Sequence, residues 1–285
     1  MERFFITGCS SGFGLATAEL AARAGHDVYA TVRNLSSAGP LEELRDGGLP
    51  IAIGKLDVTS AADVDAALAD ASARHPIDIL VNNAGYEVVA PVEHLSDAQM
   101  LSQFDTNVFG VLRLIRSILP SMRARRQGRI INISSVVAHM SVAHRGAYCA
   151  SKHALEGLTK SLWIELRPFG IDVISVAPGA FPTRFAANYV YPDGFDEQSP
   201  YWPFEMRLRN GMGPFIQEMM AGQTADDVAS AVMEVATMAK PPYQWIVGRD
   251  AELLIPLARS KDLAPLMEDW YADLGMIDLL RPSAS

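Results

Sequence analysis

The 285-residue sequence is poor in cysteine and has no long hydrophobic run. It contains two cysteines, Cys9 and Cys149, which are too few for the disulfide framework of a small secreted fold. No uncharged apolar stretch reaches the roughly 18 residues that a membrane helix needs. Strand-like sequence and a glycine motif follow the first methionine directly, which argues against a signal peptide. We therefore expect a cytoplasmic protein without a membrane span.

A surplus of positive charge is also missing. Lysine and arginine number 24 and aspartate and glutamate 33, which gives a net charge of −9. An acidic surface disfavours broad binding to nucleic-acid phosphates. Residues 122–129 form the densest basic stretch. Because it closes a helix-like segment, we interpret it as solvated charge at a helix end, with an acidic-partner site as the alternative. No nucleic-acid partner is expected.

Short apolar runs alternate with helix-like segments along the first two thirds of the chain. Strands are predicted at 4–7, 28–32, 51–56, 77–81, 129–134 and 172–177, with helices at 14–24, 62–74, 97–125 and 145–167 between them. This alternation is typical of an α/β fold with a doubly wound parallel sheet and helices on both faces. Residues 244–247 would add a seventh strand. Without a linker or repeat, residues 1–285 are expected to form a single domain.

Residues 178–222 interrupt this rhythm. The segment carries six prolines and nine of the 23 aromatic residues, and it is predicted to be a long loop that serves as a substrate-binding lid. Regular structure is expected to resume at Thr224. Residues 251–285 are predicted to be a C-terminal helical extension with a frayed end at 281–285. The nine aromatic residues are Phe181, Phe185, Tyr189, Tyr191, Phe195, Tyr201, Trp202, Phe204 and Phe215.

A glycine-rich turn follows the first predicted strand. Its glycines have the spacing Gly-x-x-x-Gly-x-Gly, which differs from the GxGxxG fingerprint. Glycine lets the backbone approach a pyrophosphate, and the helix that follows supplies free N–H groups. The alternative is a turn without a ligand. The candidate cofactor-binding residues here are Gly8, Ser10, Ser11, Gly12, Phe13 and Gly14.

The end of the second strand indicates which cofactor is preferred. An acidic residue there would bind the ribose hydroxyls of NAD, but the sequence has none and places Arg33 instead. A guanidinium suits a 2′-phosphate, so NADP(H) is expected in preference to NAD(H), unless Arg33 is simply solvated. Further candidates follow the third and fourth strands and also suit ordinary turns. They are Asp57, Val58, Asn83, Ala84 and Gly85.

Tyr148 and Lys152 lie four residues apart on a predicted helix, and therefore on one face. A phenol has an ordinary pKa near 10, which a neighbouring cation lowers. The pair therefore suits general acid–base catalysis, although spacing alone also fits two surface residues. Ser135 lies thirteen residues earlier, just past the fifth strand, where open α/β sheets bind ligands.

Taken together, these motifs resemble the short-chain dehydrogenase/reductase family. The matches are TGCSSGFG at 7–14, NNAG at 82–85, TNVFG around Asn107, Ser135, YCASK at 148–152 and PGAFPT at 178–183. They span residues 3–183, and within the family they look most like the branch of 17β-hydroxysteroid and retinol dehydrogenases. The resemblance implies a Rossmann fold and an NAD(P)-dependent oxidoreductase acting on CH–OH groups. It also implies homodimers or homotetramers formed through helices such as 97–125 and 145–167.

The resemblance also implies roles for individual residues. Tyr148 would donate the proton in reduction, and Lys152 would hold the nicotinamide ribose and lower the pKa of Tyr148. Ser135 would hold the substrate oxygen, and Asn107 would support a water relay to Lys152. Pro178, Gly179 and Thr183 would bind the nicotinamide. This chemistry needs no metal, and the histidines show no metal-ligand spacing.

The aromatic segment suggests a bulky, apolar substrate. Phe181, Phe185, Tyr189 and Trp202 are expected to contact it, with Val137, Met140 and Val142 on the opposite wall. Many aromatics of the segment would instead simply anchor it. His139 and His144 suit either a polar end of the substrate or ordinary loop contacts.

The sequence thus predicts an NADP(H)-dependent enzyme that interconverts a secondary alcohol and a ketone on a steroid-like or aryl substrate. Two alternatives stay open. One is a ketoreductase for a smaller or more polar substrate, such as a β-ketoester, an acyl thioester or a sugar. The other is a non-catalytic NADP-sensing protein.

Overall fold

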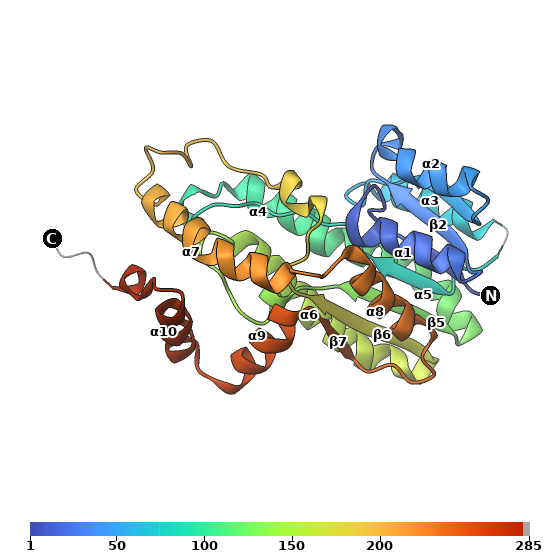
Figure 1. Ribbon diagram of the computed structural model, residues 1–285. Helices are drawn as coiled ribbons and strands as arrows, with labels where there is room; N and C mark the ends of the chain where they lie inside the picture. The colour runs from blue at the N-terminus through green and yellow to red at the C-terminus, as the bar shows by residue number, and fades with distance from the viewer. Residues whose placement is uncertain (74, 282–285) are drawn as a thin grey trace.

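Seven parallel strands form one sheet in the order β3-β2-β1-β4-β5-β6-β7. The computed structural model describes residues 1–73 and 75–281. Figure 1 shows the sheet in the right half of the view, between helices. The strands are short and strongly apolar, as expected for parallel strands that are covered on both faces. They are β1 (Arg3–Ile6), β2 (Asp27–Val32), β3 (Ile51–Lys55), β4 (Ile79–Asn82), β5 (Gly128–Ile133), β6 (Ile171–Pro178) and β7 (Gln244–Val247).

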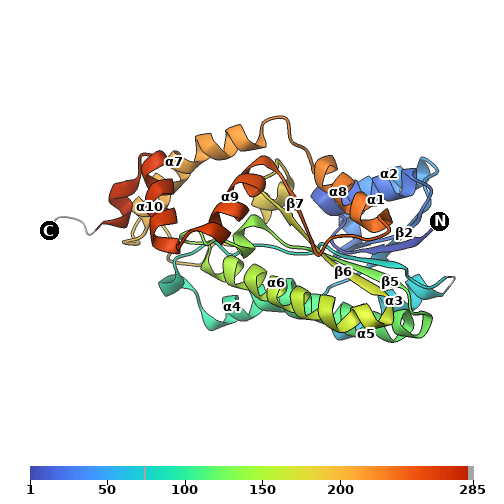
Figure 2. The same cartoon turned by 90° about the horizontal axis from the view of Figure 1, so that it is seen from below.

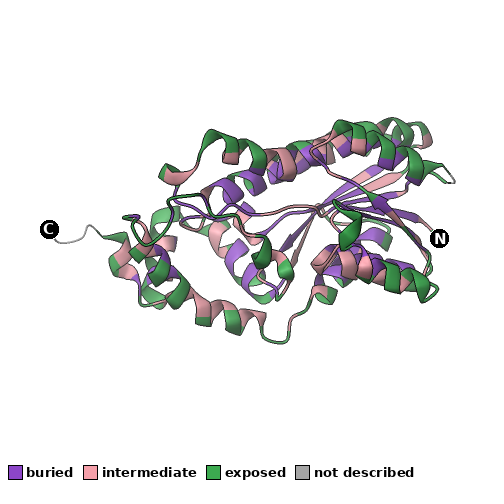
Figure 3. Ribbon diagram, turned by 90° about the horizontal axis from the view of Figure 1, so that it is seen from above, coloured by how far each residue is buried: buried purple, intermediate pink, exposed green. Residues whose placement is uncertain are grey.

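Helices cover both faces of this sheet, as Figure 2 shows. One face carries α1 (Gly12–Arg23), α2 (Gly39–Asp46) and α8 (Ala225–Thr237). The other carries α3 (Ala61–Ser72), α5 (Gly110–Arg125) and α6 (Gly146–Leu166). The buried residues are concentrated in the strands and on the inner sides of these helices (Figure 3). The predicted doubly wound α/β fold is therefore confirmed, although α2 was not predicted.

The order of the strands determines where a ligand can bind. The chain winds outward from β1 to β2 and β3 in one direction, and from β4 to β7 in the other. Loops after β1 and β4 therefore leave the sheet on opposite faces, and a crevice opens between them at the carboxyl ends of the strands. The predicted helix at 97–125 also lies beside this crevice. It consists of α4 (Asp97–Phe104), a π-helical turn (Asp105–Phe109) and α5.

The prediction of a loop throughout 178–222 is wrong for the second half of the segment. A short 3₁₀ helix (Arg184–Asn188) and an irregular stretch lead into the 19-residue helix α7 (Trp202–Met220). Pro203 lies in the first turn of α7, where its missing N–H costs nothing, and Pro214 lies inside it. These prolines and two glycines concealed the helix in the sequence.

The C-terminal helices pack against α7. They are α9 (Arg249–Ser260) and α10 (Leu263–Asp273), and they lie with α7 beyond the carboxyl ends of the strands (Figures 1 and 2). Leu208 of α7 forms a small buried cluster with Tyr271 and Met276. The expected fraying at 281–285 falls, apart from Arg281, outside the described residues. Within the described ranges, no helix combines the length and hydrophobicity needed to cross a membrane.

Candidate active site

A cavity of about 1160 Å³ lies at the carboxyl ends of the strands, between the sheet and α7. It brings together nearly all of the predicted site residues, from the glycine-rich turn to the aromatic segment. Asn107, Gly14 and Trp202 are the exceptions and do not line it. The predicted residues on its wall are Gly8, Ser10, Ser11, Gly12, Phe13, Arg33, Asp57, Val58, Asn83, Ala84, Gly85, Ser135, Val137, Met140, Val142, Tyr148, Lys152, Pro178, Gly179, Phe181, Thr183, Phe185 and Tyr189.

The glycine-rich turn forms one end of the cavity. Gly8 and Gly12 have positive φ angles of 72° and 59°, which other residues rarely adopt. A side chain at Gly14 would meet the Gly8 carbonyl oxygen at 2.5 Å, so Gly14 permits the close packing of turn and helix instead of lining the cavity. Ser11 precedes α1 without a side-chain capping bond, and the first turn of α1 has no acidic residue. The turn therefore suits a pyrophosphate.

Cys9 lies inside this turn but points into the core. Its side chain is completely buried, and its thiol donates a 3.3 Å hydrogen bond to the Ile6 carbonyl. Burial raises the pKa of the Cys9 thiol to about 12. Cys9 is therefore a packing residue and does not supply a reactive thiolate.

Asn83 holds the turn in place from the neighbouring loop. Its side-chain amide donates hydrogen bonds to the carbonyl oxygens of Thr7 (2.8 Å) and Gly8 (3.1 Å). The Thr7 hydroxyl in return accepts from the backbone N–H groups of Asn83 and Ala84, both at 2.9 Å. The loops after β1 and β4 therefore form one rigid unit, which fixes the shape of this end of the cavity.

Arg33 lies on the cavity wall just past β2, together with Asn34 and Ser37. It is exposed, and within the described part of the chain its guanidinium forms no ion pair or hydrogen bond. A free guanidinium and two small polar side chains fit the 2′-phosphate of NADP(H). Together with the glycine-rich turn, these residues could hold such a cofactor.

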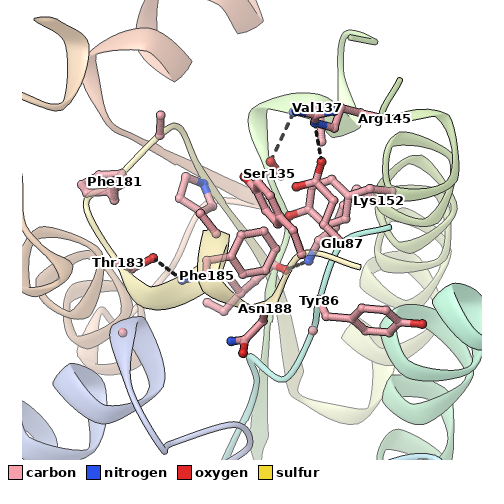
Figure 4. Close-up of a pocket in the computed structure, with 18 of the residues that line it drawn as sticks. Tyr86, Glu87, Ser135, Val137, Arg145, Lys152, Phe181, Thr183, Phe185 and Asn188 are labelled. Carbon is pink, nitrogen blue, oxygen red and sulfur yellow. Dashed lines mark hydrogen bonds and ion pairs between the residues drawn. The ribbon is translucent and has the colours of Figure 1, made fainter. Parts of the chain in front are cut away.

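Tyr148, Ser135 and Lys152 all line the cavity, and Figure 4 shows Ser135 and Lys152 on the same side of it. Ser135 follows β5, and α6 carries the other two residues on one face. Lys152 Nζ donates a 2.8 Å hydrogen bond to the Ile133 carbonyl and lies 5.7 Å from the centre of the Tyr148 ring. Burial lowers the pKa of Lys152 to about 8, while the Glu156 carboxylate opposes this shift.

The expected depression of the Tyr148 pKa does not occur in this structure. Burial and the negative charge of Glu87 raise the pKa of the Tyr148 phenol, and the Ser135 hydroxyl counteracts them only in part. The ammonium group of Lys152 is engaged by the Ile133 carbonyl. Tyr148 is therefore held as a neutral phenol, the form that donates a proton.

Asn107 lies behind the cavity wall, in the π-helical turn between α4 and α5. Its side chain accepts a hydrogen bond from Tyr86 N (3.2 Å) and donates to Tyr86 O and Ser151 Oγ, both at 3.1 Å. It therefore fixes the loop after β4 against α6. The π-helical turn directs its side chain inward, and its part in a water relay to Lys152 stays a prediction.

Glu156 is a site residue that the sequence analysis missed. It is buried one turn beyond Lys152 and accepts hydrogen bonds from Ser134 (2.9 Å) and Ser175 (2.7 Å). Tyr243 and Gln244 also donate to it. The signal in the sequence was its i, i+4 spacing from Lys152 on the same helical face.

The aromatic residues of 178–222 divide into two groups. Phe185 lies against Tyr148 with ring centres 5.7 Å apart, and Tyr189 contacts Phe185 at 5.9 Å. Phe181 instead packs edge-on against Phe13 at the cofactor end of the cavity, at 5.5 Å.

Trp202 was wrongly placed on the cavity wall. It packs on Phe195 in a cluster with Val89, Ala90 and Tyr201, because α7 begins on the outer side of that cluster.

A second set of residues that the sequence analysis missed is charged. The Glu205 carboxylate of α7 accepts hydrogen bonds from His144 Nδ1 and Arg209 Nε, each at 2.8 Å, and lies 3.6 Å from Arg145. Arg145 also pairs with Glu87 at 2.9 Å. Except for His144, all of these residues line the cavity. His139 contacts Gln244 away from the cavity, so neither histidine faces the substrate region.

Comparison with known proteins identifies the family. The family model of short chain dehydrogenases matches residues 2–192. Retinol dehydrogenase 8 of Bos taurus is 38% identical over 84% of this chain and 79% of its own. 3-Ketodihydrosphingosine reductase of Bacteroides thetaiotaomicron is 33% identical, covering 91% and 92% of the two chains, and mouse 17-beta-hydroxysteroid dehydrogenase type 1 is 33% identical over 94% and 78%. The resemblance to the hydroxysteroid and retinol dehydrogenase branch is thereby confirmed.

Solved structures agree with this result. A short-chain dehydrogenase from Streptomyces avermitilis is 32% identical, with a TM-score of 0.77 over 96% of this chain and 97% of its own. A metagenomic short-chain oxidoreductase in complex with NADP is 27% identical (TM-score 0.68, covering 86% and 96%). A Burkholderia phymatum enzyme in complex with NAD is 25% identical (TM-score 0.77, covering 100% and 96%). The chain belongs to the short-chain dehydrogenase family, whose members are oxidoreductases that act on alcohol and ketone groups.

Proposed function

We propose that this enzyme uses NADP(H) to interconvert a secondary alcohol and a ketone on a bulky, mostly apolar substrate. One observation carries the proposal: Ser135, Tyr148 and Lys152 face a single cavity that also contains Arg33 and the glycine-rich turn. Arg33 favours NADP(H), since the end of β2 offers a 2′-phosphate a free cation and no carboxylate. One solved relative is in complex with NADP and another with NAD, so the relatives favour neither cofactor. The argument for NADP(H) therefore rests on Arg33.

The cofactor would exchange a hydride with the substrate carbon, and the protein would supply binding and proton transfer. In the direction of reduction, the Ser135 hydroxyl holds the substrate oxygen and stabilises the charge that develops there. The neutral Tyr148 phenol donates its proton to that oxygen. Lys152, charged below a pH of about 8, stabilises the tyrosinate that is left.

The walls of the substrate region support an apolar substrate. Phe185 and Tyr189 lie on the side of α7, and Val137, Met140 and Val142 follow Ser135 on the other. Proteins similar to this chain carry names that refer to retinol, steroids and 3-ketodihydrosphingosine, and also to a polyketide ketoacyl reductase. A smaller ketoester or acyl thioester is therefore the second candidate substrate.

Assembly and location form part of the same proposal. Exposed apolar side chains lie along the helical layer that we expect to mediate a homodimer or homotetramer, among them Leu101, Phe109 and Ile164. A reducing compartment, the cytoplasm, agrees with the two unpaired cysteines.

A screen of NADPH consumption over ketones of graded size and polarity tests the proposal. We expect turnover of large apolar ketones, and a Tyr148→Phe protein that binds NADPH but is about a hundredfold to ten-thousandfold slower. Tyr86→Phe serves as the matched control, since this phenol lines the same cavity but is not beside Lys152. Full turnover by Tyr148→Phe would refute the acid–base assignment. Activity confined to small polar carbonyls would favour the second candidate, and NADPH binding without any turnover would favour a sensor.

A further inference from the structure

Glu87 places a carboxylate on the wall of the cavity. It lies in the loop after β4, its side chain is 6% exposed, and it lines the cavity. After burial itself, its charge has the largest effect on the pKa of the Tyr148 phenol, and it raises the pKa of Tyr189 as well. Figure 4 shows Glu87 in the same part of the cavity as Ser135 and Lys152, so the carboxylate faces the region where the reacting carbon would bind.

The loop that carries Glu87 is rigid. Val190 N donates a 3.0 Å hydrogen bond to the Glu87 carbonyl, and Val88 N donates a 2.8 Å hydrogen bond to Gln103 Oε1. Ala90 N donates to the His144 carbonyl at 2.9 Å. These bonds fix the backbone on both sides of Glu87, so its side chain is presented to the cavity in a defined position.

The Glu87 carboxylate has unused capacity to accept hydrogen bonds. Arg145 Nε lies 2.9 Å from Oε1 as an ion pair, and Figure 4 shows this pair on the same side of the cavity as Ser135. Arg145 is shared with Glu205, at 3.6 Å. Throughout residues 1–73 and 75–281, no group donates a hydrogen bond of good geometry to the Glu87 carboxylate oxygens. A buried carboxylate accepts several such bonds when donors are present.

We propose that Glu87 determines substrate specificity by accepting a hydrogen bond from a hydroxyl or amino group next to the reacting carbon of the substrate. This inference rests on the function proposed above and narrows it. The favoured substrate is a long apolar molecule with a vicinal hydroxy-ketone or amino-ketone group, in place of a plain ketone. The polar part binds between Tyr148 and Glu87, and the apolar part lies along Phe185 and the residues after Ser135.

Three matched ketones test this assignment: decan-3-one, 2-hydroxydecan-3-one and 2-aminodecan-3-one. Burial raises the pKa of Glu87 to about 7, so the assays are run above pH 7, where the carboxylate is ionised. For the wild-type protein with NADPH, we then expect kcat/KM to be about tenfold to a hundredfold higher for a donor-bearing ketone than for decan-3-one, as for a hydrogen bond to a charged group. The larger of the two gains identifies the donor as hydroxyl or amine. Glu87→Gln should reduce the gain for the amine, and Glu87→Leu should abolish both gains.

Glu93→Gln is the matched control, since it removes an exposed carboxylate six residues further along the chain that does not line the cavity. The ratio of its kcat/KM value for a donor-bearing ketone to that for decan-3-one should stay within about threefold of the wild-type ratio. A wild-type protein without preference, or a preference that survives in Glu87→Leu, would overturn the proposal.

Binding measurements separate this inference from the proposed catalysis. In a Tyr148→Phe background loaded with NADPH, calorimetry of the same three ketones should show the same order of affinity. Adding Glu87→Leu should remove that order. If no ketone is turned over but the order of affinity appears and depends on Glu87, the proposed reaction fails and the specificity assignment stands. If turnover occurs without a Glu87-dependent preference, the proposed reaction stands and the specificity assignment fails.

Discussion

Lys152 Nζ donates a 2.8 Å hydrogen bond to the carbonyl of Ile133, the last residue of β5. This bond fixes the ammonium group between the sheet and the cavity. The Glu156 carboxylate, one helical turn further along α6, raises the pKa of Lys152 against the lowering effect of burial. The charge on Lys152 near neutral pH therefore depends on both residues.

This arrangement gives a pH dependence with a defined sign. As the pH rises past about 8, Lys152 loses its charge, and kcat/KM for ketone reduction should fall. Glu156→Gln removes the charge that raises the pKa of Lys152, so the alkaline decline should begin at lower pH. Profiles of kcat/KM against pH measure this, with Glu165→Gln, an exposed carboxylate of the same helix, as the control. Identical profiles for all three proteins would contradict this account.

In the proposed function, Arg33 would determine the preference for the phosphorylated cofactor. Arg33→Ala should lower kcat/KM with NADPH about tenfold to a hundredfold, the effect of losing a charged hydrogen bond, and should leave the value with NADH nearly unchanged. Arg116→Ala provides a control for the loss of one exposed arginine far from the cavity. An unaltered ratio of the two kcat/KM values would show that another residue binds the 2′-phosphate.

Glu205 anchors α7 through His144, Arg145 and Arg209. Burial raises the pKa of Glu205, but these three partners outweigh burial and lower it from 4.5 to about 2. A depressed carboxyl pKa stabilises the folded protein above the unfolded value, near 4.5, and this stabilisation is lost as the pH falls toward 2. Glu205→Gln should therefore cost about 3 kcal/mol at pH 7 and much less at pH 3. Denaturant unfolding at the two pH values measures the difference, and an equal loss at both would argue against a charged Glu205.

Phe185 is expected to contact the substrate, whereas Trp202 is expected to anchor the start of α7. Phe185→Ala should raise the KM for a large apolar ketone about tenfold and change that for a small ketone little, because the ring lies beside Tyr148. Trp202→Ala should lower stability by about 2–3 kcal/mol with little change in the ratio of the two KM values, because its ring packs on Phe195. Thermal unfolding and kinetics on both ketones distinguish these outcomes, and the opposite pattern would reverse the two assignments.

The sequence revealed features that depend on local spacing. Tyr148 and Lys152 share a helix face whatever surrounds them, and the glycine-rich turn needs only its neighbouring strand and helix. Glu87, Arg145 and Glu205 approach one another across separations of about 60 residues, which no local pattern encodes. The pKa of Tyr148 was misjudged for the same reason, since Lys152 is close in sequence but Glu87 and the burial are tertiary features. Helix α7 escaped notice because its prolines resemble those of a loop.

The burial of both cysteines has a practical consequence. Cys9 and Cys149 are enclosed, and burial raises the pKa of each thiol. Alkylating reagents should therefore spare the folded wild-type protein. A single cysteine introduced on the exposed side of α7, for example Met206→Cys, would then be the one thiol that a fluorescent maleimide labels quickly. The native sequence thus needs no thiol removed before movements of α7 during turnover are followed optically.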